Sequence, residues 1–590
     1  MDSYSLLYSS SHRTELLGRF QQLRSDRKMC DVVLETDNAS FPCHRALLAS
    51  SSDYFWALFG DSTAERSAPS IRLPALTAEG LDAILDFLYS GWLRVSPNTL
   101  PDVLEAARYL QVDTAVTICE RYMTDGLSAE NCCSYANLAE HHALPDVLDA
   151  ANFTIAMEMA KLLRERRDDL LGLNVHSLMA VLDADEIPAV KEVELVKVAL
   201  DWLNENGPLP LLQSNLLLSR LRFGLVAPSD LAHLVHVHRA MATPLIRSQV
   251  TRAQEYHRTG SAGPIRQNKQ STLRAAPDRM LLVGGGSSPD RPEQQVLMFN
   301  MKTRTFASLT SCLPARLRNH CVCSLGGFLF VVGGEVVSEA DGKPVTVETS
   351  NQVWRYDPRF DCWQQVESML QNRAKFACCA LEDAIYAIGG QNADSNVSTT
   401  LASVEFYDMA AGAWRRGAPL PGPLHGHACA VLDHSIYVSG GLSSNSGVVM
   451  IPGQSQSSKE VLRWDGMGRA WKARAPMSIG RFSHRLATAH GYIYALLGMY
   501  EPFCDIERYD PRADHWTRLR PLLSATFNYG MAATPSGSLV VFGGTKWSNA
   551  REVVVTSVLE YDTKKDQWRE IAQLPRPLTG TECTLLPMPD

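Results

Sequence analysis

The sequence predicts a multidomain protein with an all-β, six-bladed propeller in its C-terminal half and strands followed by helices in its N-terminal half. Three observations support this. A short aromatic motif recurs six times, an apolar stretch ending in glycines precedes each copy, and the first half instead spaces its apolar residues as helices do. The motif is an aromatic–Asp pair with Trp six residues after the Asp, at Asp357/Trp363, Asp408/Trp414, Asp465/Trp471, Asp510/Trp516, Asp562/Trp568 and, more weakly, Asn300/Phe306.

Length and composition narrow the class of protein. A chain of 590 residues is too long for one core, and 45% hydrophobic with 20% charged residues is ordinary globular composition. No apolar run approaches the ~18 residues of a membrane span, and no signal peptide is recognised at the start. The net charge of −8 lies in the first 279 residues, so a general nucleic-acid binder, which would be basic, is not expected.

The 14 cysteines occur as doublets (Cys132–Cys133 and Cys378–Cys379) or as single residues, and no CxxC pair is present. Zinc sites in proteins usually need paired ligands at short spacing, so neither a metal nor another cofactor is expected. Reduced thiols are typical of a cytoplasmic protein, which could also be nuclear.

The repeated unit reads as four short strands. The glycine doublets begin at intervals of 46 to 57 residues, and a period near 50 indicates a propeller of the kelch type with one blade per copy. Glycines allow close backbone approach, and large aromatic rings fill the wedge between blades, so the motif is expected to pack rather than catalyse. The doublets begin at Gly284, Gly333, Gly389, Gly440, Leu497 and Gly543.

The first unit lacks an upstream inner strand, because the residues before Met280 are polar and basic. The end of the chain, Gly580 to Pro587, reads as a strand with no glycine doublet after it. We therefore expect this last strand to pair with the first blade and close the ring.

The first half begins with two strands, the first at Val32 to Leu34, and continues with helices. One helical segment before Gly91 carries its apolar residues on a single face, at Leu81, Ile84, Leu85 and Leu88.

The segments "CDVVLE", "FPCHRALLASSSDYF", "LDFLYSG" and "AARYLQV" resemble a BTB/POZ domain. "LSAENCCSYANLAEHHALPDVLDAANFTI" and "EVELVKVALDWLNEN" resemble the helical BACK domain, so with the six repeats nearly the whole chain resembles a Kelch-like BTB–BACK–Kelch protein. The resemblance implies an α+β BTB/POZ domain at 1–125, an all-α BACK domain at 126–256, a linker at 257–279 and the six-bladed kelch propeller at 280–590.

This resemblance implies a non-catalytic substrate-recognition adaptor of a cullin-3 RING E3 ubiquitin ligase. In the family the BTB domain forms a homodimer and binds cullin-3, and the propeller captures the protein substrate. No enzyme motif is found in the chain. The alternative is a scaffold, cytoskeletal (actin-associated) or linked to transcription, that does not bind cullin-3.

The cullin-binding pattern of the family, a large apolar residue, any residue and then Glu, falls at Thr63 to Glu65. Glu65 matches this pattern, but Thr63 is small and partly polar. The second contact region of the family matches the start of the BACK segment, at Asn131, Cys132, Tyr135 and Leu138.

The loops between blades are the candidate substrate-binding residues. We expect them to form an exposed basic rim on an otherwise neutral domain, which would attract an acidic segment of a partner. The long loops after the glycines of the second and fourth units are expected to be solvated. The rim residues are Arg316, Arg318, Arg373, Lys375, His425, Arg481, Ser483 and Asn528.

Overall fold

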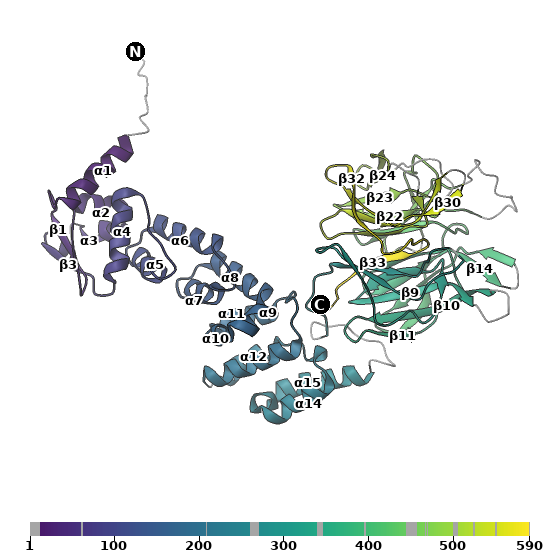
Figure 1. Cartoon of the computed structure of the whole chain (residues 1–590), viewed down its shortest axis with the longest axis horizontal. Helices are drawn as coiled ribbons and strands as arrows, with labels where there is room; N and C mark the ends of the chain where they lie inside the picture. The colour runs from purple at the N-terminus through teal and green to yellow at the C-terminus, as the bar shows by residue number, and fades with distance from the viewer. Residues whose placement is uncertain are drawn as a thin grey trace, which may run out of the picture. The chain divides into compact units, whose positions relative to one another are not determined.

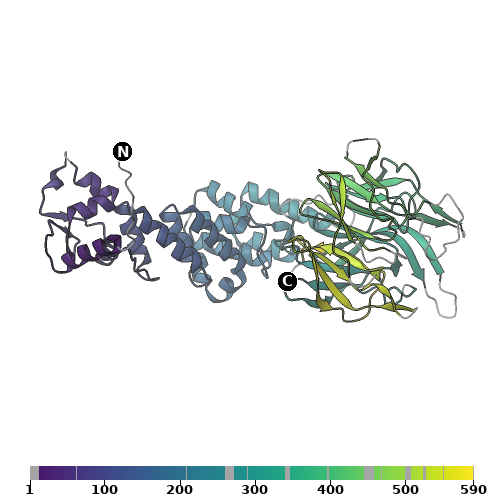
Figure 2. The same ribbon diagram turned by 90° about the horizontal axis from the view of Figure 1, so that it is seen from above.

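The computed structural model describes residues 12–60, 63–207, 209–259, 271–288, 290–338, 346–394, 397–443, 457–466, 468, 470–498, 506–522, 526–548 and 551–588. The chain forms two compact units, Met1–Val190 with Glu194–Leu221 and Lys191–Val193 with Arg222–Asp590. The first holds the purple to blue helices of Figure 1, and the strands of the second run from teal to yellow in Figures 1 and 2. Among the described residues, no helix is long and apolar enough to cross a membrane.

A three-stranded sheet opens the first unit. Strand β1 (Val32–Glu35) lies between β2 (Ser40–Cys43), which is antiparallel to it, and β3 (Ser70–Arg72), which is parallel. Val32 and Leu34 are buried, as the alternation of a half-buried strand predicts. The helices around this sheet are α1 (His12–Ser25), α2 (Arg45–Ser51), α3 (Asp53–Leu58), the 3₁₀ turn η1 (Ala64–Arg66), α4 (Ala78–Ser90), α5 (Leu100–Tyr109) and α6 (Asp113–Asp125).

Helix α4 shows why these residues form helices here. The Thr77 hydroxyl accepts the Gly80 N–H at 3.1 Å and caps the start, and Gly91 at φ 77° ends the helix in a left-handed turn. The four apolar residues that the sequence placed on one face of this helix are all buried, which confirms that prediction.

The core of this unit continues into the helices that follow. Tyr135, Ala139, Leu144 and Val147 belong to the same buried cluster as the sheet. These helices are α7 (Cys132–His141), α8 (Pro145–Met157), α9 (Met159–Glu165), α10 (Arg167–Leu171), α11 (Val175–Asp183), α12 (Glu192–Glu205) and α13 (Leu211–Ser219). The second unit begins with η2 (Phe223–Leu225), α14 (Pro228–Val237), η3 (Arg239–Ala242) and α15 (Pro244–Thr259).

Six blades follow, and the described part of each contains four antiparallel strands in one sheet. The first three blades contain, in order from the inner strand, β33 (Glu582–Leu586), β4 (Arg279–Val283), β5 (Leu297–Asn300) and β6 (Thr305–Ser308); β8 (Cys321–Leu325), β9 (Phe328–Ser338), β10 (Thr346–Asp357) and β11 (Cys362–Val366); β12 (Ala377–Leu381), β13 (Ala384–Ile388), β16 (Val404–Asp408) and β17 (Ala413–Arg416).

The other three contain β18 (Ala428–Leu432), β19 (Ser435–Ser439), β20 (Val461–Trp464) and β21 (Lys472–Arg474); β22 (Arg485–Ala489), β23 (Tyr492–Leu496), β24 (Ile506–Asp510) and β25 (His515–Arg518); β27 (Gly530–Ala533), β28 (Leu539–Phe542), β31 (Ser557–Asp562) and β32 (Gln567–Gln573). Short additional strands are β7 (Leu317–Arg318), β14 (Gln391–Asp394), β15 (Val397–Thr400), β26 (Thr526–Phe527), β29 (Thr545–Ser548) and β30 (Arg551–Val554).

The last strand closes the ring. β33 pairs with β4 in antiparallel register, from Glu582 opposite Val283 to Leu586 opposite Arg279. This confirms that the end of the chain supplies the inner strand of the first blade.

The repeated aromatic motif joins each blade to the one before it. In blade five the Tyr509 hydroxyl donates to Asp514 at 2.6 Å, and the same carboxylate accepts the Ala475 N–H of the preceding segment at 3.0 Å. The Trp516 indole N–H donates to the Ala475 carbonyl at 2.9 Å. Trp414, Trp471 and Trp568 donate to preceding carbonyls in the same way. The motif therefore packs blades together, as the sequence predicts.

The second glycine of a doublet allows the second strand of a blade to approach the start of the inner strand of the same blade. Gly441 has φ 93°, a conformation that L side chains rarely adopt. A Cβ here would lie 2.8 Å from the His427 Cβ and 2.9 Å from the His425 carbonyl oxygen. Any larger residue would push the inner strand of blade four away.

Candidate functional site

The first candidate surface surrounds the turn after α3. Ser52 caps this helix by accepting the Phe55 N–H at 3.2 Å. At the other end, Thr63 Oγ1 lies 2.6 Å from the Leu58 carbonyl oxygen and 2.9 Å from that of Gly60, to which it donates its proton. The hydroxyl of Thr63 therefore points into the turn, and only its methyl group remains for an outside contact.

Glu65 lies in the 3₁₀ turn η1, which Arg45 holds in place. The Arg45 guanidinium donates to the Glu65 carbonyl at 2.9 Å and to the Ala68 carbonyl, and it stacks 4.7 Å from the centre of the Phe59 ring. Among the described residues, the Glu65 carboxylate has no ion pair or hydrogen bond of its own. A fixed turn thus presents a free carboxylate beside α3.

Solvent-accessible aromatic side chains on α3 and α5 were missed by the sequence interpretation. Trp56 is 70% exposed, although its neighbour Phe55 is fully buried. The rings of Tyr54 and Tyr109 lie 5.3 Å apart, and burial raises the pKa of Tyr54 to about 12. Adjacent helix residues point about 100° apart, so Trp56 next to a core Phe55 was a signal that could have been used.

At the start of α7, Cys132 has no exposed surface and Tyr135 is 5% exposed, so both side chains pack inside the unit, and a contact of this segment with cullin-3 stays a prediction. Asn131 is used in a turn, where its side chain accepts the Ser128 N–H at 2.9 Å and donates to the Gly126 carbonyl at 2.8 Å. Leu138 is half-buried.

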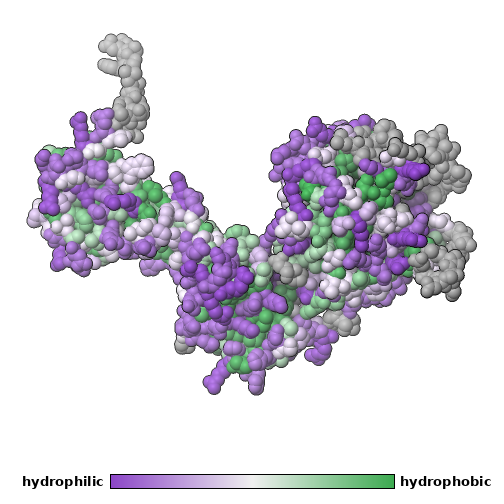
Figure 3. Space-filling view, viewed as in Figure 1, coloured by the Kyte–Doolittle hydropathy of each residue, from purple (hydrophilic) through white to green (hydrophobic). Residues whose placement is uncertain are grey.

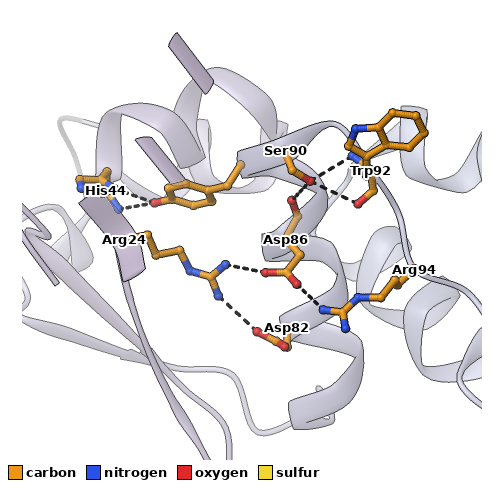
Figure 4. A network of polar contacts seen from close by, with 8 residues as sticks. Arg24, His44, Asp82, Asp86, Ser90, Trp92 and Arg94 are labelled. Atoms are coloured by element: carbon orange, nitrogen blue, oxygen red, sulfur yellow. Dashed lines mark hydrogen bonds and ion pairs between the residues drawn. The ribbon is translucent and has the colours of Figure 1, made fainter. Parts of the chain in front are cut away.

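Helix α1 is attached to α4 through one arginine (Figure 4). Arg24 donates to Asp86 at 3.0 Å and to Asp82 at 3.3 Å, and its guanidinium lies 5.2 Å from the centre of the Tyr89 ring. This contact leaves Leu16, in the first half of the helix, 48% exposed.

Figure 4 also shows Trp92, which follows α4. Its backbone N–H donates to the Ser90 hydroxyl at 3.1 Å, and the Trp92 side chain is 84% exposed. In the face seen in Figure 3 most of the described surface is hydrophilic, with small, separate apolar patches. The exposed Trp56 on α3, the helix that precedes the Thr63–Glu65 turn, is therefore a candidate contact residue.

The second candidate surface is a central cavity of about 470 Å³ in the propeller, which we call the mouth. Five of the eight predicted rim residues line it: Arg318, Lys375, His425, Ser483 and Asn528.

A backbone ring shapes the mouth. Six residues, one before each inner strand, adopt the left-handed conformation with φ between 51° and 71°. Hydrogen bonds join neighbours around the ring: Lys375 N–H to Asn319 O at 3.1 Å, Gly426 N–H to Lys375 O at 2.8 Å, Ser483 N–H to Gly426 O at 2.7 Å, and Gly580 N–H to Asn528 O at 2.7 Å. The side chains at the mouth are therefore held by a rigid backbone.

The mouth carries more positive than negative charge. Arg318 pairs with Glu335 at 2.6 Å and with Asp290 at 3.1 Å, and Arg485 pairs with Glu582. Lys375 has no ion pair among the described residues, so it is the free cation of the lining.

His425, which also lines the mouth, is neutral at pH 7. Burial and, secondarily, the charge of Lys375 lower the pKa of His425 to about 4.

Arg373 and Arg481 do not lie on the exposed rim, which corrects the expectation. Arg373 is 0% and Arg481 2% exposed. The guanidinium of Arg373 pairs with Glu405 at 2.5 Å, and that of Arg481 pairs with Glu507 at 3.0 Å. Both carboxylates are also buried, so these pairs stabilise the fold and leave no free charge for a partner.

Arg316 is exposed but does not line the mouth. It lines an adjoining hollow of about 400 Å³ together with Arg291 and Glu293, and this hollow shares Pro292 with the mouth. The tips of the two long loops after the glycines, at 339–345 and 444–456, lie outside the described residues.

Comparisons with known proteins agree with this architecture. Family models match as a BTB/POZ domain at residues 20–127, as "BTB And C-terminal Kelch" at 132–236, as a KLHDC2/KLHL20/DRC7 Kelch-repeats domain at 247–441 and as a Kelch motif at 480–523. Kelch-like protein 34 of Homo sapiens is 39% identical, over 99% of this chain and 96% of its own length. Kelch-like protein 36 of Bos taurus is 31% identical, over 98% and 93%.

The fold and its two surfaces define an adaptor or scaffold protein built from protein-interaction domains. The chain belongs to the Kelch-like BTB–BACK–Kelch family.

Proposed function

We propose that this chain is a substrate-recognition adaptor of a cullin-3 RING E3 ubiquitin ligase. The observation that carries the proposal is the Tyr54–Tyr109 ring pair with the Glu65 carboxylate near Tyr54, together with the exposed Trp56 on another side of the same helix. Exposed aromatic residues are the side chains most enriched at the centre of protein interfaces. A carboxylate at their edge supplies orientation.

Thr63 sets the strength of this contact. Its methyl group replaces the large apolar side chain of the family pattern, and burial of such a side chain is worth roughly 1.5–3 kcal/mol. We therefore expect a cullin-3 affinity about ten- to a hundred-fold lower than with Met or Leu at this place. The Thr63 hydroxyl also holds the turn through its hydrogen bonds, so Thr63→Met gains affinity from its larger side chain but loses these bonds. Thr63→Val removes the hydroxyl without adding a large side chain, so it measures the effect of the lost bonds alone.

The test is calorimetric titration of the full chain with the N-terminal domain of cullin-3. Trp56→Ala is expected to weaken binding at least tenfold, whereas Trp92→Ala, an equally exposed tryptophan away from α3, is the matched control. If neither the wild type nor Thr63→Met binds cullin-3, the adaptor proposal fails. The small side chain at Thr63 then favours the alternative of a cytoskeletal or transcription-linked scaffold.

We also propose that the chain acts as a homodimer through its BTB domain. Leu16 on α1 is an exposed apolar residue on a helix that Arg24 fixes in place. Light scattering of the full chain is expected to give twice 65.1 kDa, and Leu16→Asp is expected to lower that mass. A monomer at micromolar concentration contradicts this part of the proposal.

The proposed substrate contact is the mouth, which would bind an acidic segment of a cytoplasmic or nuclear protein. Lys375 supports this, since the residue is half-buried and its ammonium group has no ion pair within the described part of the chain. Partners found by proximity labelling, with and without proteasome and neddylation inhibitors, should be lost with Lys375→Glu and kept with Lys472→Glu, an exposed change in blade four. Equal recovery with both variants contradicts the assignment of the mouth.

A further inference from the structure

A second hollow, of about 330 Å³, lies between blades three and four, and it shares no lining residue with the mouth. Three aromatic rings surround it, from Tyr386 on β13, Phe406 on β16 and Trp464 on β20. The Tyr386 ring lies 5.6 Å from that of Phe406 and 5.3 Å from that of Trp464. All three side chains are half-buried, so part of each ring faces the hollow.

Blade three differs from its neighbours at this place. Phe406 stands opposite Tyr386 in the ladder between the second and third strands. The residues at the same ladder position in blades two, four and five are arginines, whose guanidinium groups lie 4.8, 5.8 and 4.5 Å from the centre of an aromatic ring. These arginines are Arg355, Arg463 and Arg508. In blade three Phe406 stands in place of this arginine, so an aromatic ring lies where blades two, four and five place a guanidinium group.

Blade four also differs from the other blades, at Trp464. At the Trp464 position, three other blades carry a tyrosine whose hydroxyl binds the aspartate of its own hairpin. The Trp464 indole N–H instead donates to the Gly468 carbonyl at 2.6 Å. The polar edge of this ring is thus satisfied internally. Around it lie Gly417, Gly466 and Gly468, which have no side chains to cover the rings.

Two polar groups remain free at the hollow. Among the described residues, neither the Tyr386 hydroxyl nor the exposed Arg416 guanidinium has a hydrogen-bond or ion-pair partner. Both are hydrogen-bond donors at neutral pH, and one of them is a cation. A ligand must therefore supply acceptors and negative charge, and a cationic side chain is disfavoured.

We propose that this hollow binds a proline-containing acidic peptide segment of a partner protein. Proline-rich segments present flat apolar rings and backbone carbonyls without N–H groups, and aromatic grooves recognise them through both. Here a proline ring packs against the exposed edges of the Tyr386, Phe406 and Trp464 rings, a peptide carbonyl accepts from the Tyr386 hydroxyl, and a carboxylate pairs with Arg416. This site does not depend on cullin binding or on the mouth.

The test is fluorescence polarisation of the full chain with labelled nonapeptides. Three repeats of Pro-Pro-Glu are the probe, and repeats of Pro-Pro-Lys and of Gly-Gly-Glu lack the charge or the rings. The Pro-Pro-Glu peptide is expected to bind at least fivefold more tightly than either of the others. Tighter binding of Pro-Pro-Lys overturns the proposal in favour of a cation site, and equal binding of Gly-Gly-Glu shows that the rings are not used.

Substitutions at the hollow test whether the peptide binds there. Phe406→Arg restores the residue that blades two, four and five use, so it is expected to fold normally, fill the hollow and lower binding at least tenfold. Arg416→Glu is expected to do the same, and its matched control is Arg518→Glu, because Arg518 is exposed at the same ladder position of blade five. Binding that survives Phe406→Arg and Arg416→Glu but is lost with Lys375→Glu assigns the peptide to the mouth and refutes the proposal.

Discussion

Removing one partner of the buried pair Arg373–Glu405 is expected to destabilise the propeller. The guanidinium is fully buried, where it donates to Glu405 at 2.5 Å and to the carbonyls of Gly389 and Ser403 at 2.8 and 2.9 Å. With Arg373→Leu the Glu405 carboxylate, 1% exposed, keeps only the Leu370 N–H at 2.6 Å. An uncompensated charge of this kind typically costs about 3–5 kcal/mol.

Blade four provides the matched control. The backbone carbonyl of Arg373 and that of Leu424 each accept the N–H of the second glycine of a doublet, in consecutive blades. The two residues therefore occupy equivalent positions in the repeat. Leu462, three residues before Asp465, corresponds to Glu405. The double variant Arg373→Leu with Glu405→Leu therefore copies a pair that the propeller already contains, and it should be more stable than the single variant because no charge is left buried.

The assay is calorimetric melting of the full chain. With an unfolding entropy of about 2.1 cal/mol/K per residue, a loss of 3–5 kcal/mol in a domain of about 310 residues lowers the propeller transition by about 5–8 °C. A shift below about 1 °C for Arg373→Leu, or a double variant no more stable than the single one, refutes the reasoning.

Three further outcomes are expected from melting experiments. Trp516→Phe should cost about 0.5–1.5 kcal/mol through loss of its hydrogen bond, whereas Trp363→Phe should cost no hydrogen bond, since the buried Trp363 indole N–H has no partner among the residues that the structure describes; equal shifts would contradict this. Deletion of Gly580–Asp590 removes β33 and exposes the edge of β4, so the propeller should melt lower or aggregate, and an unchanged transition argues against closure. Burial lowers the pKa of His320 to about 4, so as the pH falls the unfolded chain binds this proton before the folded chain does. The stability of the propeller should therefore fall between about pH 6.5 and 4. His320→Phe, which copies Phe376 of blade three, should flatten that part of the dependence of stability on pH.

The blades and the closure of the ring were predictable because their signals are local. Four of the five motif tryptophans donate to a carbonyl of the preceding blade, and the first glycine of a doublet approaches the following blade, so spacing alone identifies the units. The burial of Arg373 and Arg481 was not predicted, because each loop was interpreted without its partner strand. A signal was available: Glu405 and Glu507 each stand three residues before the motif aspartate, in the same units as the two arginines.

The surface near α3 was predicted less well for a different physical reason. A helix pattern separates an apolar face from a polar one, but it does not tell whether an apolar face meets the core or a partner. Tyr135 is buried in the core, whereas Trp56, which the sequence interpretation did not consider, is exposed to solvent.

Neighbouring residues of β16 should control different properties of blade three. Glu405 is buried and pairs with Arg373, which comes from the loop before the blade, whereas Phe406 is half-buried, stacks on the Tyr386 ring and lines the hollow together with Trp464 of the next blade. Successive side chains of a strand point to opposite faces, so Glu405 and Phe406 have different neighbours, and the one residue that connects them is Arg416, which stands opposite Glu405 and lines the hollow. The double variant Arg373→Leu with Glu405→Leu is therefore expected to keep the peptide affinity of the hollow, and Phe406→Arg to keep the melting temperature. If the double variant also lost the peptide, or if Phe406→Arg melted several degrees lower, the two faces of the blade would be coupled, and the hollow could not be assigned as an independent binding site.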